Sequence, residues 1–155
     1  MVSVFNFTKE LAMISSTKLR KIRHLRNMTQ KEVASLSGLT PAAIRNYELG
    51  NRSPSKKQLD KIALSLGCNP SAITDYSNYT IYDIIQLILD LEPDFGFSPC
   101  TQSEIPKLKS SNESFNNFLK DWDEMRLKKY NYEISEEKLF KWIISYNPGN
   151  HKDEI

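Results

Sequence analysis

Apolar residues recur three and four positions apart through residues 17–73, which is the spacing of one face of an α-helix. Five short helices are expected there, over about 17–27, 29–37, 40–48, 54–66 and 69–73. The positions expected to face a shared core are Leu19, Ile22, Leu25, Val33, Ala34, Leu36, Ile44, Tyr47, Leu59, Ile62, Ala63 and Leu66. Helices of this length can enclose one small hydrophobic core.

Start and stop signals separate the second and third helical patterns. Thr29 is a good N-cap and Glu32 stands three residues later, the spacing of a capping box. Gly38 can take the positive φ that ends a helix, and Thr40 followed by Pro41 opens the next one. A helix, a tight glycine turn and a second helix form the layout that places a helix in the major groove of DNA.

The fourth helix follows a loop over 49–54. Ser53 is expected to cap it, with Pro54 at its first position and Gly67 after its end. Asn69 and the proline after it open a fifth short helix, through residue 73.

Residues 81–91 read IYDIIQLILDL and are apolar around most of a helix. A helix that is apolar on all sides is usually buried. Because the chain is small, this pattern indicates that another subunit covers part of the helix.

The remaining patterns predict a β-hairpin and two helices. Residues 97–108 contain two prolines and are a candidate short β-hairpin. Asn112 or Ser114 can cap a helix to about Tyr130, and Ser135 can cap a last helix that ends at residue 148. The expected fold class is therefore mostly α, with five helices in the first part and a helical extension after it.

Charge is divided unevenly along the chain. Residues 17–61 carry eleven Lys or Arg residues and three acidic residues, a net charge of +8. Residues 62–155 carry nine basic and fifteen acidic residues, a net charge of −6. The first segment is attracted to phosphate and the second is repelled by it.

The order of these signals resembles the phage-repressor and Cro-like helix-turn-helix family over residues 18–73. The residues that carry the resemblance are Leu19, Ile22, Arg23, Thr29, Gln30, Glu32, Ala34, Gly38, Leu39, Thr40, Ile44, Tyr47, Glu48, Gly50, Arg52, Pro54, Leu59, Ile62, Ala63, Leu66 and Gly67. The resemblance covers about a third of the chain and implies a DNA-binding transcriptional regulator.

The resemblance assigns the helix over 40–48 to base recognition. Its outward positions would be Pro41, Ala42, Ala43, Arg45 and Asn46. Asn46 can pair with adenine and Arg45 with guanine, whereas the alanines can touch only thymine methyl groups. Specificity is therefore expected to depend on Arg45, Asn46 and the shape of the bound DNA.

Phosphate contacts are expected around the recognition helix, because such contacts fix the register of the protein on the duplex. The candidates are Gln30, Thr40, Asn51 and Arg52. In the resembled family, the residues matching Arg23 and Glu48 form a partly buried ion pair, so both are expected to be structural.

The expected domains are an N-terminal extension at 1–16, a DNA-binding domain at 17–74, a dimerisation or interaction region at 75–149 and a tail at 150–155. We expect a cytoplasmic repressor that binds double-stranded DNA as a homodimer, with no cofactor, metal or membrane span. The expected dimer contacts are Ile81, Ile84, Ile85, Ile88, Leu91, Trp122 and Trp142.

The sequence offers two alternatives to a DNA-binding regulator. The chain could be an antitoxin or interaction module whose second half binds a partner protein, because that half is strongly apolar. An enzyme is disfavoured, since the sequence holds no nucleophile–base set, metal-ligand cluster or phosphate loop. Cys68 and Cys100 are isolated and are expected to be structural or incidental thiols.

Overall fold

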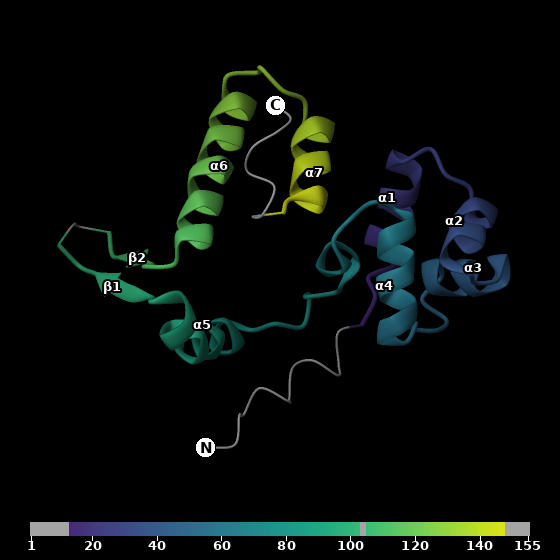
Figure 1. Ribbon diagram of the computed structural model, residues 1–155, viewed down its shortest axis with the longest axis horizontal. Helices are drawn as coiled ribbons and strands as arrows, with labels where there is room; N and C mark the ends of the chain where they lie inside the picture. The colour runs from purple at the N-terminus through teal and green to yellow at the C-terminus, as the bar shows by residue number, and fades with distance from the viewer. Residues whose placement is uncertain (1–12, 103–104, 148–155) are drawn as a thin grey trace. The chain divides into compact units, whose positions relative to one another are not determined.

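The computed structural model describes residues 13–102 and 105–147. The chain divides into two compact units, residues 1–78 and 79–155 (Figure 1). The predicted tail 150–155 and most of the predicted extension 1–16 lie outside the described residues.

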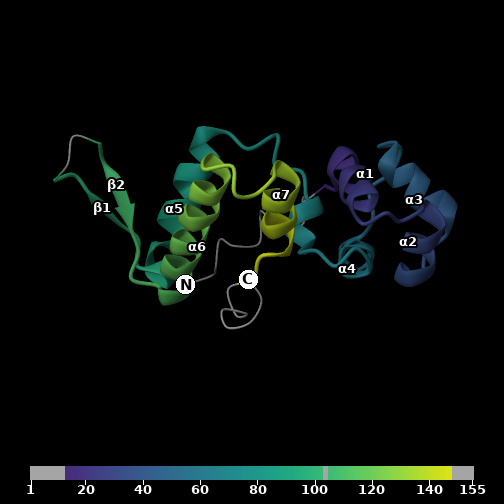
Figure 2. The same ribbon diagram turned by 90° about the horizontal axis from the view of Figure 1, so that it is seen from above.

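Within its described part, the first unit consists of short helices around one core. They are α1 (Ser16–Leu25), α2 (Gln30–Ser37), α3 (Pro41–Glu48), α4 (Lys56–Ser65) and the short 3₁₀ helix η2 (Pro70–Ile73). α2 packs against both α3 and α4, and α2 and α3 lie side by side in Figure 2. η2 packs against α1 and α4. The largest fully buried side chains of this unit are Leu19, Ile22, Val33, Ile44, Ile62, Leu66 and Ile73. The predicted five-helix arrangement is confirmed.

The caps of α2 and α3 follow the local sequence signals. The Glu32 amide donates to Thr29 Oγ1 at 3.2 Å, and the Thr29 amide donates to Glu32 Oε2 at 2.7 Å, which completes the capping box. Gly38 ends α2 with a φ of 66°, and Thr40 caps α3 by accepting from the Ala43 amide at 3.1 Å. These local interactions fix both ends of the turn between the two helices.

The start of α4 differs from the prediction. Ser55, not Ser53, is the N-cap, and α4 begins at Lys56. The physical reason is Gln58, three residues after Ser55, whose Oε1 accepts from the Ser55 amide at 2.9 Å. This second capping box satisfies two backbone donors, so the Pro54 position lies outside the helix.

One side-chain placement and one helix end were also predicted wrongly. Leu36 is 68% exposed, and the buried position on that side of α2 belongs to Ser37, whose hydroxyl donates to the Val33 carbonyl at 2.6 Å. α1 ends at Leu25 rather than near residue 27, because Asn27 adopts a left-handed φ of 53°. Such a conformation ends an α-helix.

The carboxyl end of α4 is bound by a side chain from just after α1. Arg26 Nε donates to the Leu66 carbonyl at 3.0 Å, and its Nη2 donates to the Gly67 carbonyl at 2.9 Å. A guanidinium there satisfies carbonyls that lack helical partners and lies at the negative end of the helix dipole. Arg26 therefore links α1 to α4.

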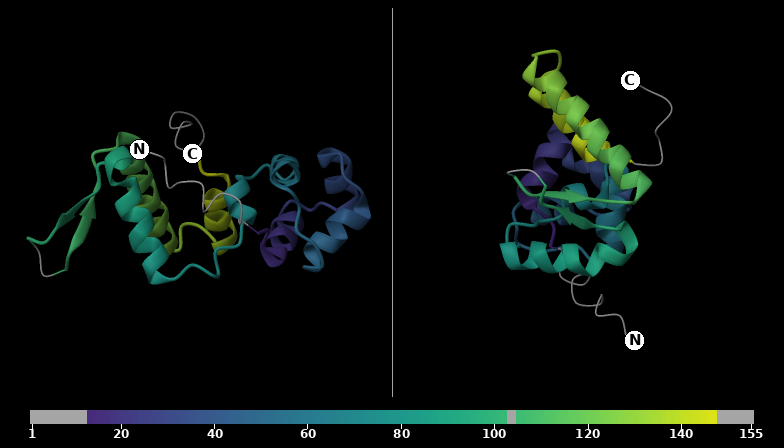
Figure 3. Two further views of the ribbon diagram at one scale, coloured as in Figure 1. Left: turned by 90° about the horizontal axis from the view of Figure 1, so that it is seen from below. Right: turned by 90° about the vertical axis from the view of Figure 1, so that its left-hand side faces the viewer.

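The second unit contains α5 (Ile81–Phe95), β1 (Ser98–Cys100), β2 (Lys107–Lys109), α6 (Glu113–Tyr130) and α7 (Glu136–Ser145). The strands form the predicted antiparallel hairpin (Figure 3). Pro99 lies opposite Leu108. Asn112 caps α6 and Ser135 caps α7. α5 is longer than expected and continues through Pro93 to Gly96.

The end of α5 is fixed close to the start of α6. Gly96 has a φ of 56°, and a Cβ there would lie 1.8 Å from Ser111 Oγ, so only glycine fits. The Ser110 hydroxyl donates to the Phe95 carbonyl, and the Phe95 and Phe115 rings meet edge to face at 6.1 Å. These contacts anchor the carboxyl end of α5 on α6.

The core of the second unit is a row of aromatic rings rather than a fully buried interior. The ring-to-ring distances along the row are 5.2 Å for Phe97–Phe115, 5.7 Å for Phe118–Trp122, 5.2 Å for Phe118–Tyr146 and 4.9 Å for Trp142–Tyr146. Among the described residues of this unit, the buried apolar side chains are Phe97, Ile134 and Ile144. Neither α5 nor α6 contains a buried residue.

The predicted fold class is confirmed, since helices dominate residues 13–102 and 105–147 and the sheet found there is a single two-stranded hairpin. No helix in the described parts of the chain is long and apolar enough to cross a lipid bilayer.

Replacing Arg26 with Met tests the link between α1 and α4. We expect a loss of about 1–2 kcal/mol in the free energy of unfolding, because two carbonyls lose charged donors. Urea denaturation measures the loss, and Lys61→Met, an exposed change on α4, is the matched control. Equal stability of the two variants would show that Arg26 does not stabilise the unit.

Candidate nucleic-acid interface

α3 has one buried face and one outward face. Ile44, Tyr47 and Glu48 are buried in the first unit. The predicted base-contacting residues lie on the other side: Pro41, Ala42 and Arg45 are exposed, and Ala43 and Asn46 are half-buried at its edge. The exposed start of α3 presents no side-chain hydrogen-bond donor before Arg45, as the sequence indicated.

The predicted phosphate contacts at the ends of α3 are exposed. Thr40 Oγ1 accepts a backbone hydrogen bond, which leaves the hydroxyl proton able to donate outward. Asn51 and Arg52 follow α3, and the Asn51 amide donates to the Asn46 carbonyl at 3.0 Å. This bond holds the start of the loop against the helix that precedes it.

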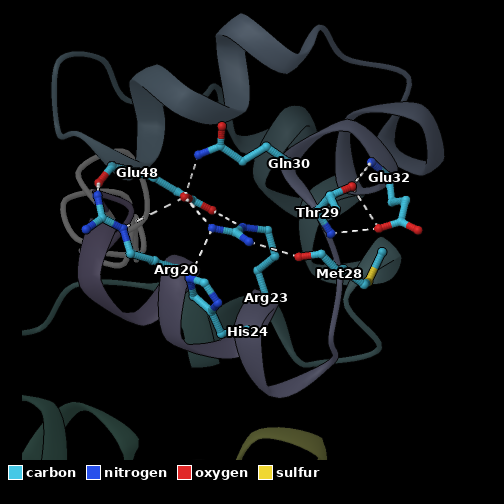
Figure 4. A network of polar contacts seen from close by, with 8 residues as sticks. All are labelled: Arg20, Arg23, His24, Met28, Thr29, Gln30, Glu32 and Glu48. Atoms are coloured by element: carbon cyan, nitrogen blue, oxygen red, sulfur yellow. Dashed lines mark hydrogen bonds and ion pairs between the residues drawn. The ribbon is translucent and has the colours of Figure 1, made fainter.

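A bidentate ion pair joins α1 to the end of α3 (Figure 4). Arg23 Nε donates to Glu48 Oε1 at 2.5 Å, and Arg23 Nη2 donates to Glu48 Oε2 at 2.9 Å. Arg23 is 8% exposed and Glu48 is 3% exposed. Arg23 Nη1 also donates to the Met28 carbonyl at 2.9 Å, which ties the pair to the segment before α2.

Two further side chains bind Glu48 (Figure 4). Arg20 Nη2 donates to the Glu48 carbonyl at 3.0 Å, and Gln30 Nε2 donates to Glu48 Oε2 at 2.8 Å. Arg20 Nε lies 3.8 Å from the same carboxylate oxygen. Glu48 thus joins α1, α2 and α3 through one carboxylate and one carbonyl.

This network is part of what orients α3. Burial alone would raise the pKa of Glu48, but hydrogen bonds from Arg23 and Gln30 and the charges of Arg23 and Arg20 outweigh it. The pKa of Glu48 is therefore below its ordinary value, and the hydrogen bond to Glu48 raises the pKa of Arg23. Both groups are held in their charged forms.

Gln30 lies differently from the position expected of a phosphate contact. Its side chain is turned toward Glu48 at the start of α2, and one amide hydrogen is used in that bond. The second amide hydrogen is the group that could reach a phosphate. The sequence could not reveal this contact, because the two residues lie 18 positions apart.

Part of the predicted basic charge is used inside the unit. Arg20, Arg23 and Arg26 bind groups of the fold, and Lys18 Nζ donates to the Thr74 carbonyl at 2.9 Å. The exposed cations from α2 to the start of α4 are Lys31 on α2, Arg45 on α3, Arg52 in the loop after it, and Lys56 and Lys57 at the start of α4. Lys31, Lys56 and Lys57 were missed as candidates. The signal for the latter pair was two lysines in a first helical turn, where the helix dipole disfavours cations.

The predicted dimer contacts lie on the second unit and are partly or largely exposed. Ile81, Ile84, Ile85 and Trp122 are exposed, and Ile88, Leu91 and Trp142 are half-buried. Among the described residues, no three His, Cys, Asp or Glu side chains gather as metal ligands. Burial raises the pKa of the Cys68 thiol to about 11.

Comparisons with known proteins bear on the first unit. A family model described as helix-turn-helix matches residues 19–73, which confirms the resemblance drawn from the sequence. Among solved structures, the chain is similar to the restriction-modification controller protein C.AhdI from Aeromonas hydrophila. The identity is 29%, the match covers 37% of this chain and 88% of that chain, and the TM-score is 0.37. No curated protein matches the chain.

The Glu48 network predicts a pH dependence of stability. Because the pKa of Glu48 is lowered on folding, its charged form stabilises the protein above the ordinary value of 4.5, and this stabilisation is lost as pH falls through the lowered pKa. Glu48→Gln should cost about 3 kcal/mol near pH 7, since it leaves Arg23 without a countercharge. The difference from wild type should shrink toward pH 3 in urea denaturation.

Asp60→Asn is the matched control, because Asp60 is exposed on α4 and its substitution removes the same negative charge as Glu48→Gln. A Glu48→Gln variant as stable as Asp60→Asn at neutral pH would contradict the structural role of the pair.

Proposed function

We propose that this chain, whose residues 19–73 form a domain of the helix-turn-helix family, is a sequence-specific DNA-binding transcriptional regulator. The observation that carries the proposal is the fixed, outward-facing α3, whose inner end is bound to α1 and α2 through Glu48. A helix held in this way can enter the major groove with its outer side toward the bases. The cations around it supply attraction to phosphate.

The exposed residues divide into base contacts and phosphate contacts. Arg45 is suited to guanine and Asn46 to adenine. Pro41, Ala42 and Ala43 allow close approach and contact with thymine methyl groups. Thr40, Asn51 and Arg52 are assigned to the backbone, with Gln30 through its second amide hydrogen. Lys31, Lys56 and Lys57 join this set because they are exposed cations on α2 and at the start of α4, the elements that flank α3 in the sequence.

The proposal includes a homodimer that acts as a repressor in the cytoplasm. One module buries too little DNA surface for high specificity, whereas two modules can bind half-sites about one helical turn apart. The second unit supplies the dimer contacts, because its helices expose apolar side chains. Repression needs only that the bound dimer occupy a promoter. No catalytic activity is part of the proposal.

A second candidate function rests on the same exposed apolar helices. The second unit could bind a different protein, as an antitoxin or an interaction module does. Co-expression with the products of neighbouring genes separates the two functions. A stable hetero-complex that forms in place of the homodimer would favour the second.

DNA selection tests the proposal as a whole. We expect the folded chain to enrich a near-palindromic sequence from a random pool and to shift that DNA in a gel at physiological salt. The absence of any enriched sequence, with circular dichroism showing folded protein, would contradict it.

Two variants test how α3 is docked. Arg52→Ala should weaken binding to all sequences about equally and reduce the slope of log K against log salt by about one, because one phosphate contact is lost. Asn46→Ala should cost about 1–3 kcal/mol on the selected site and relax the preference at one base pair. Fluorescence anisotropy measures both.

Lys120→Ala is the control for these variants, since Lys120 is exposed on α6 in the second unit. If Arg52→Ala and Asn46→Ala bind like this control, the assignment of α3 to the groove is wrong.

A further inference from the structure

One face of α5 is an unpartnered apolar stripe. Ile81, Ile85 and Leu89 stand four residues apart, and the last two side chains are 48% and 56% exposed. Glu92 follows three residues later on the same face. Phe95, at the end of the helix, is the residue that packs on Phe115 of α6. The stripe is thus an exposed apolar surface that ends in a carboxylate.

The charged residues of α5 and of the sequence on either side of it are all acidic. Residues 62–106 contain six acidic residues and no Lys or Arg. Two copies of α5 laid face to face would bring like charges together, which disfavours that pairing. The complementary surface must therefore be apolar with a cation.

α6 of the same unit presents such a surface. Trp122 is 40% exposed, and the Arg126 guanidinium lies over its ring, with Cζ 5.7 Å from the centroid. Leu119 lies on the same helix face, three residues before Trp122. Among the described residues, neither Glu92 nor Arg126 takes part in an ion pair. The α5 stripe ends in the negative charge of Glu92, and the α6 surface carries the positive charge of Arg126, so each could neutralise the other.

Distance along α6 disfavours a contact between Glu92 and Arg126 of the same chain. α5 is anchored near Phe115, and Arg126 lies eleven residues further along α6. At about 1.5 Å per residue this is a separation of about 16 Å along the helix axis. Glu92 is one turn before Phe95 and is therefore held near the N-terminal end of α6, whereas Arg126 lies toward its C-terminal end.

We infer that the α5 stripe of one copy docks on the Trp122–Arg126 face of a second copy, with Glu92 against Arg126 of that copy. A two-fold axis makes the contact reciprocal, so each copy supplies one stripe and one Trp–Arg face and the assembly closes as a dimer. The inference rests on the proposed homodimer and adds which surfaces form it and why they attract.

Charge reversal tests the contact by analytical ultracentrifugation of the full chain without DNA. Glu92→Lys and Arg126→Glu should each weaken the dimer at least about tenfold, because each places like charges in both copies of the contact. Asp90→Lys makes the same charge change on the polar face of α5 and should leave the dimer unchanged.

Mixing the two variants is the decisive step. Glu92→Lys chains should pair with Arg126→Glu chains, because both contacts of the mixed dimer then join opposite charges. The variant with both substitutions should form a homodimer again. Native mass spectrometry with a tag on one chain identifies the mixed species.

The inference is overturned if the wild-type chain stays monomeric at tens of micromolar, or if the single variants dimerise like Asp90→Lys. It is also overturned if the double variant recovers but the mixture does not, since the charges would then pair within one chain. Gel shifts of the same samples report DNA binding separately, so failure of the contact is distinguishable from failure of the proposed function.

Discussion

The first unit depends on one buried carboxylate at the end of its third helix. Glu48 accepts hydrogen bonds from Arg23 and Gln30, while its carbonyl accepts from Arg20. A charge at 3% exposure is tolerated because these donors replace the water that it has lost. The same contacts that satisfy the carboxylate also set the direction of α3. The contacts that stabilise the first unit therefore also orient α3, the proposed recognition helix.

The two units differ in how they satisfy their apolar residues. The first encloses Leu19, Ile22 and their neighbours completely, and its polar groups are used to lock helices together. The second leaves α5 and α6 without a buried residue and joins its helices through stacked rings. Its acidic charge opposes contact with DNA. This difference agrees with the proposed function, in which the first unit would bind DNA and the second would bring chains together.

The sequence predicted what neighbouring residues decide. The Thr29–Glu32 capping box and the Gly38 turn depend only on residues within a few positions of each other, so the local sequence was enough to predict both. The prediction of Ser53 as the cap of α4 was wrong, because Gln58, three residues after Ser55, completes a capping box with Ser55. The exposure of Leu36 and the contact from Gln30 to Glu48 depend on how helices pack, which local spacing does not encode.

The Arg23–Glu48 pair acts as a unit in holding α3, the proposed recognition helix. A double-mutant cycle with Arg23→Met, Glu48→Met and the combined variant measures this directly as free energies of unfolding. We expect the combined variant to lose at least about 2 kcal/mol less free energy of unfolding than the sum of the two single losses, because each single change leaves a buried charge unpaired. Additive losses would contradict it.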